Sequence, residues 1–207
     1  MVRQERAERT RQRIIEAAAE VFDQNGFSGT SVSEILARAG VTKGALYFHF
    51  PSKEAIAATI EGSEVVALAA VVSASGPFLQ AVIDLSHGMA RALQESPMVR
   101  ASIRLAIESS FSEPSPGPYV SSIELIRTLL LRAQGEGTVR LDLDVDAAAR
   151  FIISSFTGAQ IVSQVFTGRQ DLEQRLVELW GFILPGLVVP GGAEGLRLSA
   201  PQPLTTG

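Results

Sequence analysis

The sequence predicts an all-α protein of about nine helices, arranged as a small N-terminal unit of three helices and a larger helical bundle. Apolar residues recur with the 3.6-residue period of a helix along most of the chain, and the alternation that is typical of strands is nearly absent. N-cap residues, glycines and prolines divide these periodic stretches into separate segments. With 207 residues, 46% of them apolar, the chain is long enough to bury a sizeable core.

The first three helices follow from local signals. Residues 6–25 carry apolar side chains at i, i+4, i+7 and i+8, which predicts one buried stripe, and Gly26 ends this helix. The stretch SVSE, from Ser31 to Glu34, predicts a capping box at the start of a short second helix that Gly40 ends. Thr42 is the predicted N-cap of a third helix, which cannot extend beyond Phe50 because a proline follows.

The rest of the chain is predicted to be helical with short interruptions. A fourth helix should begin after Ser52 and run to about residue 74, and further helices should occupy about 77–95, 97–110, 119–134, 146–167 and 170–184. We expect a helix-turn-helix domain over 1–53, a ligand-binding and dimerisation domain over 54–189, and a disordered tail over 190–207, which has little to bury.

Composition limits the function. The chain has no cysteine, which excludes disulfides, thiolate metal sites and a cysteine nucleophile. Its two histidines lie in different predicted helices, and no zinc-protease, nucleophile-elbow or phosphate-loop motif is present, so we predict neither an enzyme nor a cofactor. The charged N-terminus predicts no secretory signal, and the apolar runs are too short to cross a membrane, so we expect a cytoplasmic protein.

Charge is distributed unevenly along the chain. Residues 1–53 carry a net charge of +2, whereas the remainder carries −6. A small cationic part on an acidic body favours one local anionic partner, although a solvated helix end would give the same count. The aspartates in DLDVD, from Asp142 to Asp146, could suggest a metal site. A loop that ends in an N-cap is the favoured interpretation, so we predict no metal.

Two short helices joined by a glycine-containing turn form a helix-turn-helix pattern, whose second helix enters the DNA major groove with its N-terminal end. That end carries Thr42, Lys43 and Gly44. Lys43 can donate to guanine or to a phosphate, and Gly44 lets the backbone approach DNA closely. Tyr47 and His49 are expected to bind phosphates, with a core tyrosine and a solvated histidine as the alternatives.

Further DNA contacts are predicted around this helix. Lys53 is a phosphate candidate, and hydroxyls at the second helix could donate to the DNA backbone. Arginines near the N-terminus could follow the backbone or a minor groove. Phe48 and Phe50 are expected to face inward and to hold the third helix against the core. The additional candidates are Thr30, Ser31, Ser33, Arg3, Arg6 and Arg11.

The stretch from Arg11 to Ile56 closely resembles the DNA-binding domain of TetR-family transcriptional repressors. Within that family, VTKGALYFHF is most similar to the γ-butyrolactone receptors of actinomycetes that produce antibiotics, and the resemblance continues through Leu85–Ala106 and Leu176–Val189. The residues that carry it in the first stretch are Ile15, Ala17, Ala18, Phe22, Gly26, Thr30, Ala39, Gly40, Val41, Gly44, Tyr47, Phe50 and Lys53.

The resemblance implies a homodimer, paired through its last two helices, that represses transcription by binding a pseudo-palindromic double-stranded DNA operator and that a small-molecule inducer releases. The chain departs from the subgroup at Ser122, where that subgroup usually has a tryptophan lining the ligand pocket. The inducer could therefore be a γ-butyrolactone, a furan, a butenolide or an antibiotic intermediate. A regulator of the same family that does not respond to a lactone is the alternative.

Polar residues amid apolar runs mark candidate ligand contacts in the body. The candidates are the polar residues His87, Ser122, Thr157 and Gln160 and the apolar Phe156, each with packing or dimer contact as the alternative. The last two helices offer more apolar surface than one bundle covers, which predicts a four-helix dimer contact. The residues of that surface are Ile152, Phe156, Ile161, Val165, Leu172, Leu176, Leu179 and Trp180.

Overall fold

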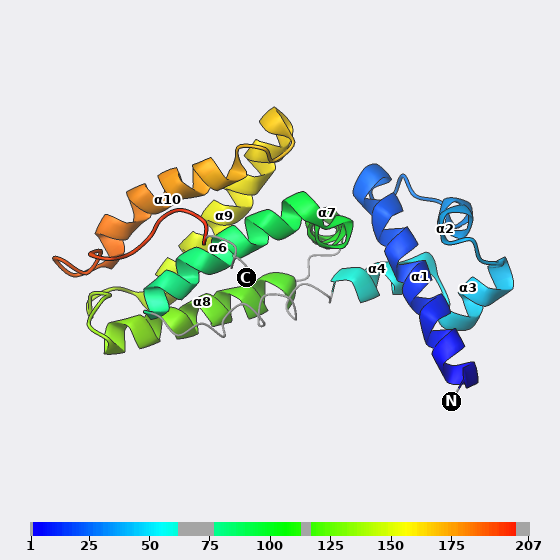
Figure 1. Cartoon of the computed structure of the whole chain (residues 1–207), viewed down its shortest axis with the longest axis horizontal. Coiled ribbons are helices and arrows are strands. Elements are labelled where there is room, and N and C mark those ends of the chain that lie inside the picture. Colours follow the sequence, from blue (N-terminus) through cyan, green and yellow to red (C-terminus); the bar gives the residue numbers. More distant parts are fainter. Residues whose placement is uncertain (1, 62–76, 113–116, 202–207) are drawn as a thin grey trace, which may run out of the picture. The chain divides into compact units, whose positions relative to one another are not determined.

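The structure is a computed structural model that describes residues 2–61, 77–112 and 117–201 (Figure 1). Within these ranges it has nine α-helices and no strand; an isolated antiparallel bridge joins Val139 to Val188. The all-α class is therefore confirmed. None of the helices in the described ranges is long and apolar enough to span a membrane.

The first compact unit contains the N-terminal helices and one helix from the middle of the chain. Its small core surrounds Phe22, Ile35 and Leu46, all with no exposed surface. Leu105, from the later helix, belongs to the same core. The helices of this unit are α1 (Val2–Asn25), α2 (Val32–Ala39), α3 (Lys43–His49), α4 (Lys53–Glu61) and α7 (Pro97–Ser112).

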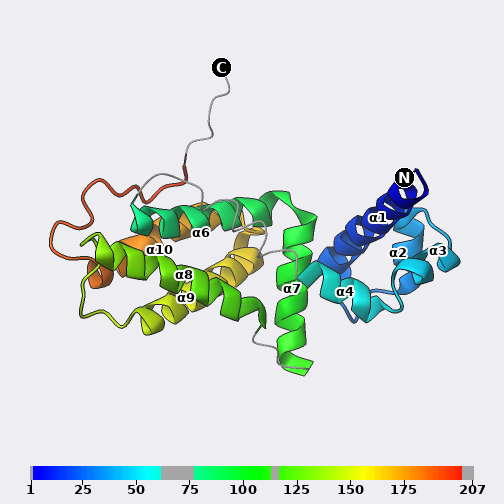
Figure 2. The same ribbon diagram turned by 90° about the horizontal axis from the view of Figure 1, so that it is seen from below.

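The second unit contains the remaining helices, which run alongside one another in both views (Figures 1 and 2). Trp180 is almost completely buried there, and its indole N–H donates to the Ser86 hydroxyl at 2.9 Å. The helices of this unit are α6 (Phe78–Glu95), α8 (Gly117–Gly135), α9 (Val145–Thr167) and α10 (Leu172–Leu187).

Helix ends mostly follow the predicted signals. Helix α1 begins four residues earlier than predicted, and α10 continues through Pro185 to Leu187, because a proline in the last turn removes only one backbone bond. The Val188 N–H still donates to the Leu184 carbonyl at 3.1 Å and closes the helix. Helix α4 is described only to Glu61, so its predicted extension to residue 74 lies outside the described residues.

The segment from 190 to 201 differs from the predicted disordered tail. Arg197 exchanges backbone bonds with the Gln80 side chain and pairs with Asp84 at 2.8 Å, and the Leu198 carbonyl contacts His87. The sequence prediction counted apolar residues only, whereas backbone groups and one guanidinium bind this segment to α6. Residues 202–207 lie outside the described part of the chain.

The predicted domain boundary at residue 53 remains a proposal about function. The compact units follow a different division, because α7 packs on α1 and α4 although it lies far beyond residue 53 in the sequence. Sequence distance therefore does not decide which helices support the N-terminal end.

Candidate DNA-binding end and ligand-binding body

The helix-turn-helix pair is built by its caps. The Ser31 hydroxyl accepts from the Glu34 N–H at 3.3 Å, and the Glu34 carboxylate accepts from the Ser31 N–H at 2.7 Å, so the predicted capping box is present. The Ser31 N–H and the Ser31 hydroxyl, which donates to the same carboxylate at 2.8 Å, hold the pKa of Glu34 below its usual range. Gly40 ends α2 in the left-handed region, with φ at 62°, and Thr42 caps α3 by accepting from the Ala45 N–H at 3.2 Å.

The N-terminal end of α3 is open to solvent. Thr42, Lys43 and Gly44 are exposed, and a side chain at Gly44 would meet nothing within 4 Å. Tyr47 is 44% exposed, and the Lys43 ammonium lies 5.9 Å from the centre of its ring. The structure therefore brings these four predicted residues onto one accessible face, and His49 is half-buried at the end of the same helix.

Phe48 corrects the sequence prediction. Its side chain is 78% exposed and meets the His49 ring edge-on, with 5.0 Å between the ring centres. The inward positions are Leu46, which is fully buried, and Phe50, which is 3% exposed. Leu46 and Phe50 are four residues apart and share one side of the chain, whereas Phe48 lies between them on the opposite side.

Lys53 and Thr30 both have hydrogen-bond partners within the N-terminal unit, and their predicted DNA contacts stay predictions. The Lys53 ammonium donates to the carbonyls of Phe27 and Thr30 at 2.8 and 2.7 Å. The Thr30 side chain is buried, and its hydroxyl donates to the Gly26 carbonyl at 2.7 Å. The carbonyls of Gly26, Phe27 and Thr30 lie in the turn between α1 and α2, outside any helix, so these side chains satisfy them.

The remaining predicted DNA contacts lie at the surface. Ser31, Ser33 and Arg6 are exposed. The Arg11 guanidinium lies over the Phe50 ring at 5.2 Å, so part of its side chain packs on the core. The Arg3 side chain lies outside the described residues.

The five predicted ligand contacts lie on α6, α8 and α9 and have separate neighbours. His87 is 1% exposed; its Nε2 lies 2.7 Å from the Leu198 carbonyl, and its buried Nδ1 has no hydrogen-bond partner among the described residues. Gln160 is also buried, and its side-chain oxygen accepts from the Arg169 guanidinium at 3.1 Å. Ser122 and Phe156 are half-buried.

Thr157 lines an open recess of about 370 Å³ between α8 and α9, and its hydroxyl donates to the carbonyl of Ile153 one turn earlier. The recess is lined mainly by side chains from α9, with Tyr119 and Ile123 from α8. His87, Gln160 and Thr157 each contact different residues. These contacts therefore do not bring the three side chains together in one ligand site.

Two stretches of the chain match known families. Residues 14–60 match the bacterial regulatory proteins of the tetR family, and residues 76–190 match the tetracyclin repressor-like C-terminal domain. The chain is also 41% identical to the A-factor receptor protein of Streptomyces griseus over 191 residues, which are 92% of this chain and 68% of that protein. The chain belongs to the TetR family.

Solved structures agree with this membership. A gamma-butyrolactone receptor described as ArpA-like is 37% identical, with a TM-score of 0.77 over 91% of this chain and 93% of that one. CprB from Streptomyces coelicolor, solved with its operator sequence, is 34% identical, with a TM-score of 0.77 over 92% of this chain and 95% of that one. Members of the family are transcriptional regulators and not enzymes.

The surface of α9 and α10 in this TetR-family chain is partly different from the predicted one. Ile152, Leu172, Leu176 and Trp180 are buried in their own unit, so they cannot belong to an exposed surface. Ile161 and Val165 are exposed as predicted, and the other exposed large apolar side chains of α9 and α10 are Phe151, Val162, Phe166 and Phe182. Phe151 of α9 and Phe182 of α10 line one open apolar groove of about 470 Å³.

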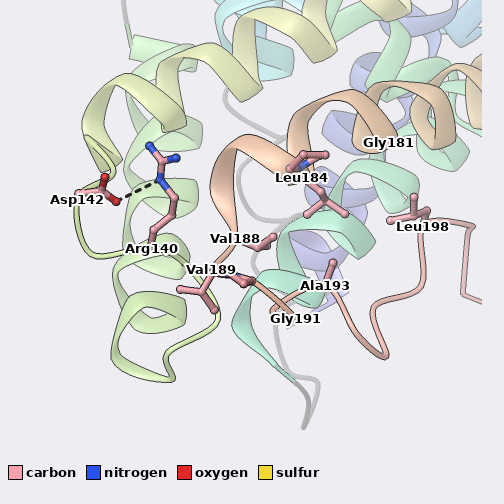
Figure 3. A pocket seen from close by; sticks show the side chains of 11 residues that line it. Arg140, Asp142, Gly181, Leu184, Val188, Val189, Gly191, Ala193 and Leu198 are labelled. Carbon is pink, nitrogen blue, oxygen red and sulfur yellow. Dashed lines mark ion pairs between the residues drawn. The ribbon is translucent and has the colours of Figure 1, made fainter.

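A second groove, of about 800 Å³, lies beside the C-terminal end of α10 (Figure 3). Leu184, Val188 and Leu198 form part of its apolar wall, and Arg140 pairs with Asp142 across 3.2 Å at its edge. The other aspartates of DLDVD have separate partners: Asp144 accepts from the Ala147 N–H, and Asp146 pairs with Arg127.

The sequence did not predict a role for Glu108 of α7, although its side chain contacts the turn after α1. Its carboxylate accepts from the Phe27 N–H at 2.7 Å. The two residues are 81 positions apart, and no local pattern predicts a contact at that separation. Only the packing of α7 against α1 makes it visible.

Proposed function

We propose that this chain is a homodimeric transcriptional repressor that binds a pseudo-palindromic DNA operator and leaves it when a small molecule enters the helical body. The observation that carries the proposal is the exposed N-terminal end of α3 in a chain whose two parts both match the TetR family. The proposed location is the cytoplasm, where such a regulator meets chromosomal DNA.

The proposed DNA-reading surface consists of the α3 side chains that remain free to approach the major groove. Lys43 is the donor for guanine or phosphate, and the bare backbone at Gly44 permits close approach. Tyr47 and His49 are the phosphate contacts. Phe48 adds an apolar side chain that can contact a thymine methyl group, which is a role that its exposure supports.

Other surface residues are proposed as backbone contacts. Thr42, Ser31 and Ser33 present exposed hydroxyls near the two short helices, and Arg6 is an exposed cation on α1. Arg3 stays a proposal from the sequence. Lys53 and Thr30 are left out, because both have partners inside the N-terminal unit.

A small apolar ligand with one hydroxyl or carbonyl fits the proposed sensing role. The related receptor from S. griseus is named for A-factor, and the ArpA-like structure is named for a gamma-butyrolactone. For this chain we propose a ligand of the lactone, furan or butenolide type, or an antibiotic intermediate. His87 is its best-supported contact, since Nδ1 is a buried acceptor without a partner among the described residues, where a ligand hydroxyl could donate.

A release experiment tests the function. The purified chain is bound to an operator fragment selected from genomic DNA, and actinomycete lactones, furans, butenolides and antibiotic intermediates are added separately. Release by one class, with a weaker response in His87→Phe, supports the proposal. Tight operator binding that none of the compounds reverses would instead indicate the regulator without a lactone response.

A further inference from the structure

In the turn that follows α1, both backbone polar groups of Phe27 form hydrogen bonds with side chains from other helices. The Phe27 N–H donates to the Glu108 carboxylate of α7 at 2.7 Å, and the Phe27 carbonyl accepts from the Lys53 ammonium of α4 at 2.8 Å. The Phe27 ring also stacks on Phe22, with 5.9 Å between centres, and lies 4.2 Å from that ammonium. Side chains from two other helices therefore fix the backbone of this residue.

Glu108 is held in place by its own neighbours. Its second carboxylate oxygen accepts from Arg104 at 2.8 Å, and Arg104 also donates to the Asp23 carbonyl at 2.7 Å. Arg100 pairs with the Asp23 carboxylate at 2.8 Å, and these two side chains are only about one-fifth exposed. Hydrogen bonds that involve charged groups are stronger than neutral ones. The bonds of Glu108, Arg104 and Arg100 therefore attach α7 firmly to the C-terminal end of α1.

Gly26 has no side chain and so leaves space for the Glu108 carboxylate and the Arg104 guanidinium. Its φ of 72° is in the region that favours glycine. A Cβ atom there would lie 2.4 Å from a Glu108 carboxylate oxygen and 2.9 Å from the Arg104 guanidinium. The carboxylate can reach the neighbouring Phe27 N–H because no side chain is present at Gly26.

The turn at Phe27 leads directly into α2 and α3, the helix-turn-helix pair. The Lys53 ammonium donates to the Thr30 carbonyl at 2.7 Å as well as to Phe27, and Ser31 then begins the cap of α2. We propose that Glu108 and Lys53 are positioning residues for DNA binding, which hold the turn at Phe27 and thereby fix the α2–α3 pair against α1. This inference rests on the proposed operator binding.

The hydrogen bonds of Glu108 and Lys53 with the Phe27 backbone together form a clamp on this turn. Substitution of Glu108 by glutamine tests the first of these two contacts. Glu108→Gln keeps the size of the side chain but removes its charge, and Glu16→Gln on the exposed side of α1 is the matched control. We expect Glu108→Gln to lower operator affinity about tenfold while affinity for random DNA stays unchanged, since a misplaced α3 still presents its cation, Lys43. An equal loss on both DNAs, or no loss on either, would overturn the positioning role.

Lys53 is tested by the salt dependence of binding. Lys53→Met keeps the chain length and removes the ammonium. A lost phosphate contact would lower the slope of log affinity against log salt by about 0.9. The clamp predicts lower operator affinity with an unchanged slope, and a reduced slope would return Lys53 to the DNA surface and overturn its positioning role.

A readout without DNA separates this inference from the proposed function. Amide exchange at Phe27 should accelerate about tenfold in Glu108→Gln and stay unchanged in Glu16→Gln, because only the first variant weakens the acceptor. If the unaltered chain binds no DNA, the proposed function fails, and the positioning role fails with it. If it binds an operator and Glu108→Gln neither weakens that binding nor speeds exchange, only the clamp fails.

Discussion

Two regions of this molecule expose large apolar side chains in different chemical surroundings. On α3, Phe48 is 78% exposed, and its close neighbours in sequence include a tyrosine and a histidine, with Lys43 on the preceding turn. On α10, Phe182 is 87% exposed and lines an apolar groove with Phe151. One aromatic side chain lies among hydrogen-bond donors, and the other belongs to a continuous apolar surface.

The difference shows which partner each region suits. Donors around a single apolar group match the edge of a base pair, which combines polar atoms with a methyl group. A broad apolar surface on two helices matches a second copy of the same surface, as in a two-fold symmetric contact. Exposure alone does not distinguish these cases, whereas the neighbouring residues do.

The largest expected effect is the loss of the dimer in Phe182→Glu. Two symmetric carboxylates without partners would be buried, which costs several kcal/mol. Sedimentation should show the mass falling from twice the 22.0 kDa of the chain to that value itself. Leu141→Glu, at an equally exposed loop residue outside α9 and α10, should stay dimeric, and a monomer there would remove the distinction.

The next effect separates the two phenylalanines near the end of α3. Phe50→Ala should lower the free energy of unfolding by about 3–5 kcal/mol, because it empties a buried site. Phe48→Ala should change it by less than about 0.5 kcal/mol. Chemical denaturation measures both, and equal losses would show that Phe48 belongs to the core after all.

Removal of the cation on α3 should reduce operator binding without changing stability. Lys43→Ala is expected to weaken affinity about 10- to 100-fold, because a base or phosphate contact at the reading end is lost. A titration of labelled operator at moderate salt measures it. Unchanged affinity would mean that α3 does not face the DNA through this end.

A smaller loss is expected for Phe48→Ala on the same operator. We expect about a tenfold loss that disappears when one contacted thymine is replaced by uracil, since the apolar partner of Phe48 is then already absent. A loss that persists on every uracil-substituted site would assign Phe48 to some other role.

The smallest effect concerns the turn that joins α9 to α10. Asp171 accepts from Arg175 of α10 and from Ser163 and Thr167 of α9, and these bonds hold its pKa far below the usual range. A lowered folded-state pKa gives a stabilisation that is present above the unfolded pKa of about 3.9 and is lost as the pH falls below that value toward the folded-state pKa. Asp171→Asn should flatten this acid dependence in thermal unfolding, and an unchanged slope would contradict the assignment.

Local signals were sufficient for the helical framework. The capping box at Ser31, the stop at Gly40 and the cap at Thr42 depend on residues within four positions of one another, and all three are present. The buried Leu46 could have been found in the same way, since its spacing to Phe50 is the helical one. The prediction favoured Phe48 because a seven-residue helix is too short to show its period clearly.

Contacts across long sequence distances were not predictable. Lys53 looked like a free cation because nothing near it in sequence reveals the carbonyls at Phe27 and Thr30. The same holds for Leu198, which reaches His87 across 111 positions and orders a segment that composition alone made look disordered. Side chains that satisfy distant backbone groups leave no periodic pattern in the sequence.

Selection of DNA from a random pool by the purified chain tests the central claim most directly. We expect enrichment of a pseudo-palindrome whose half-sites lie about one helical turn apart, about 10 base pairs or a multiple of it, because each protomer presents one α3 helix. The same selection with Lys43→Ala should enrich poorly. No enrichment by the unaltered chain, or enrichment of a single half-site, would contradict a dimeric regulator that reads DNA through α3.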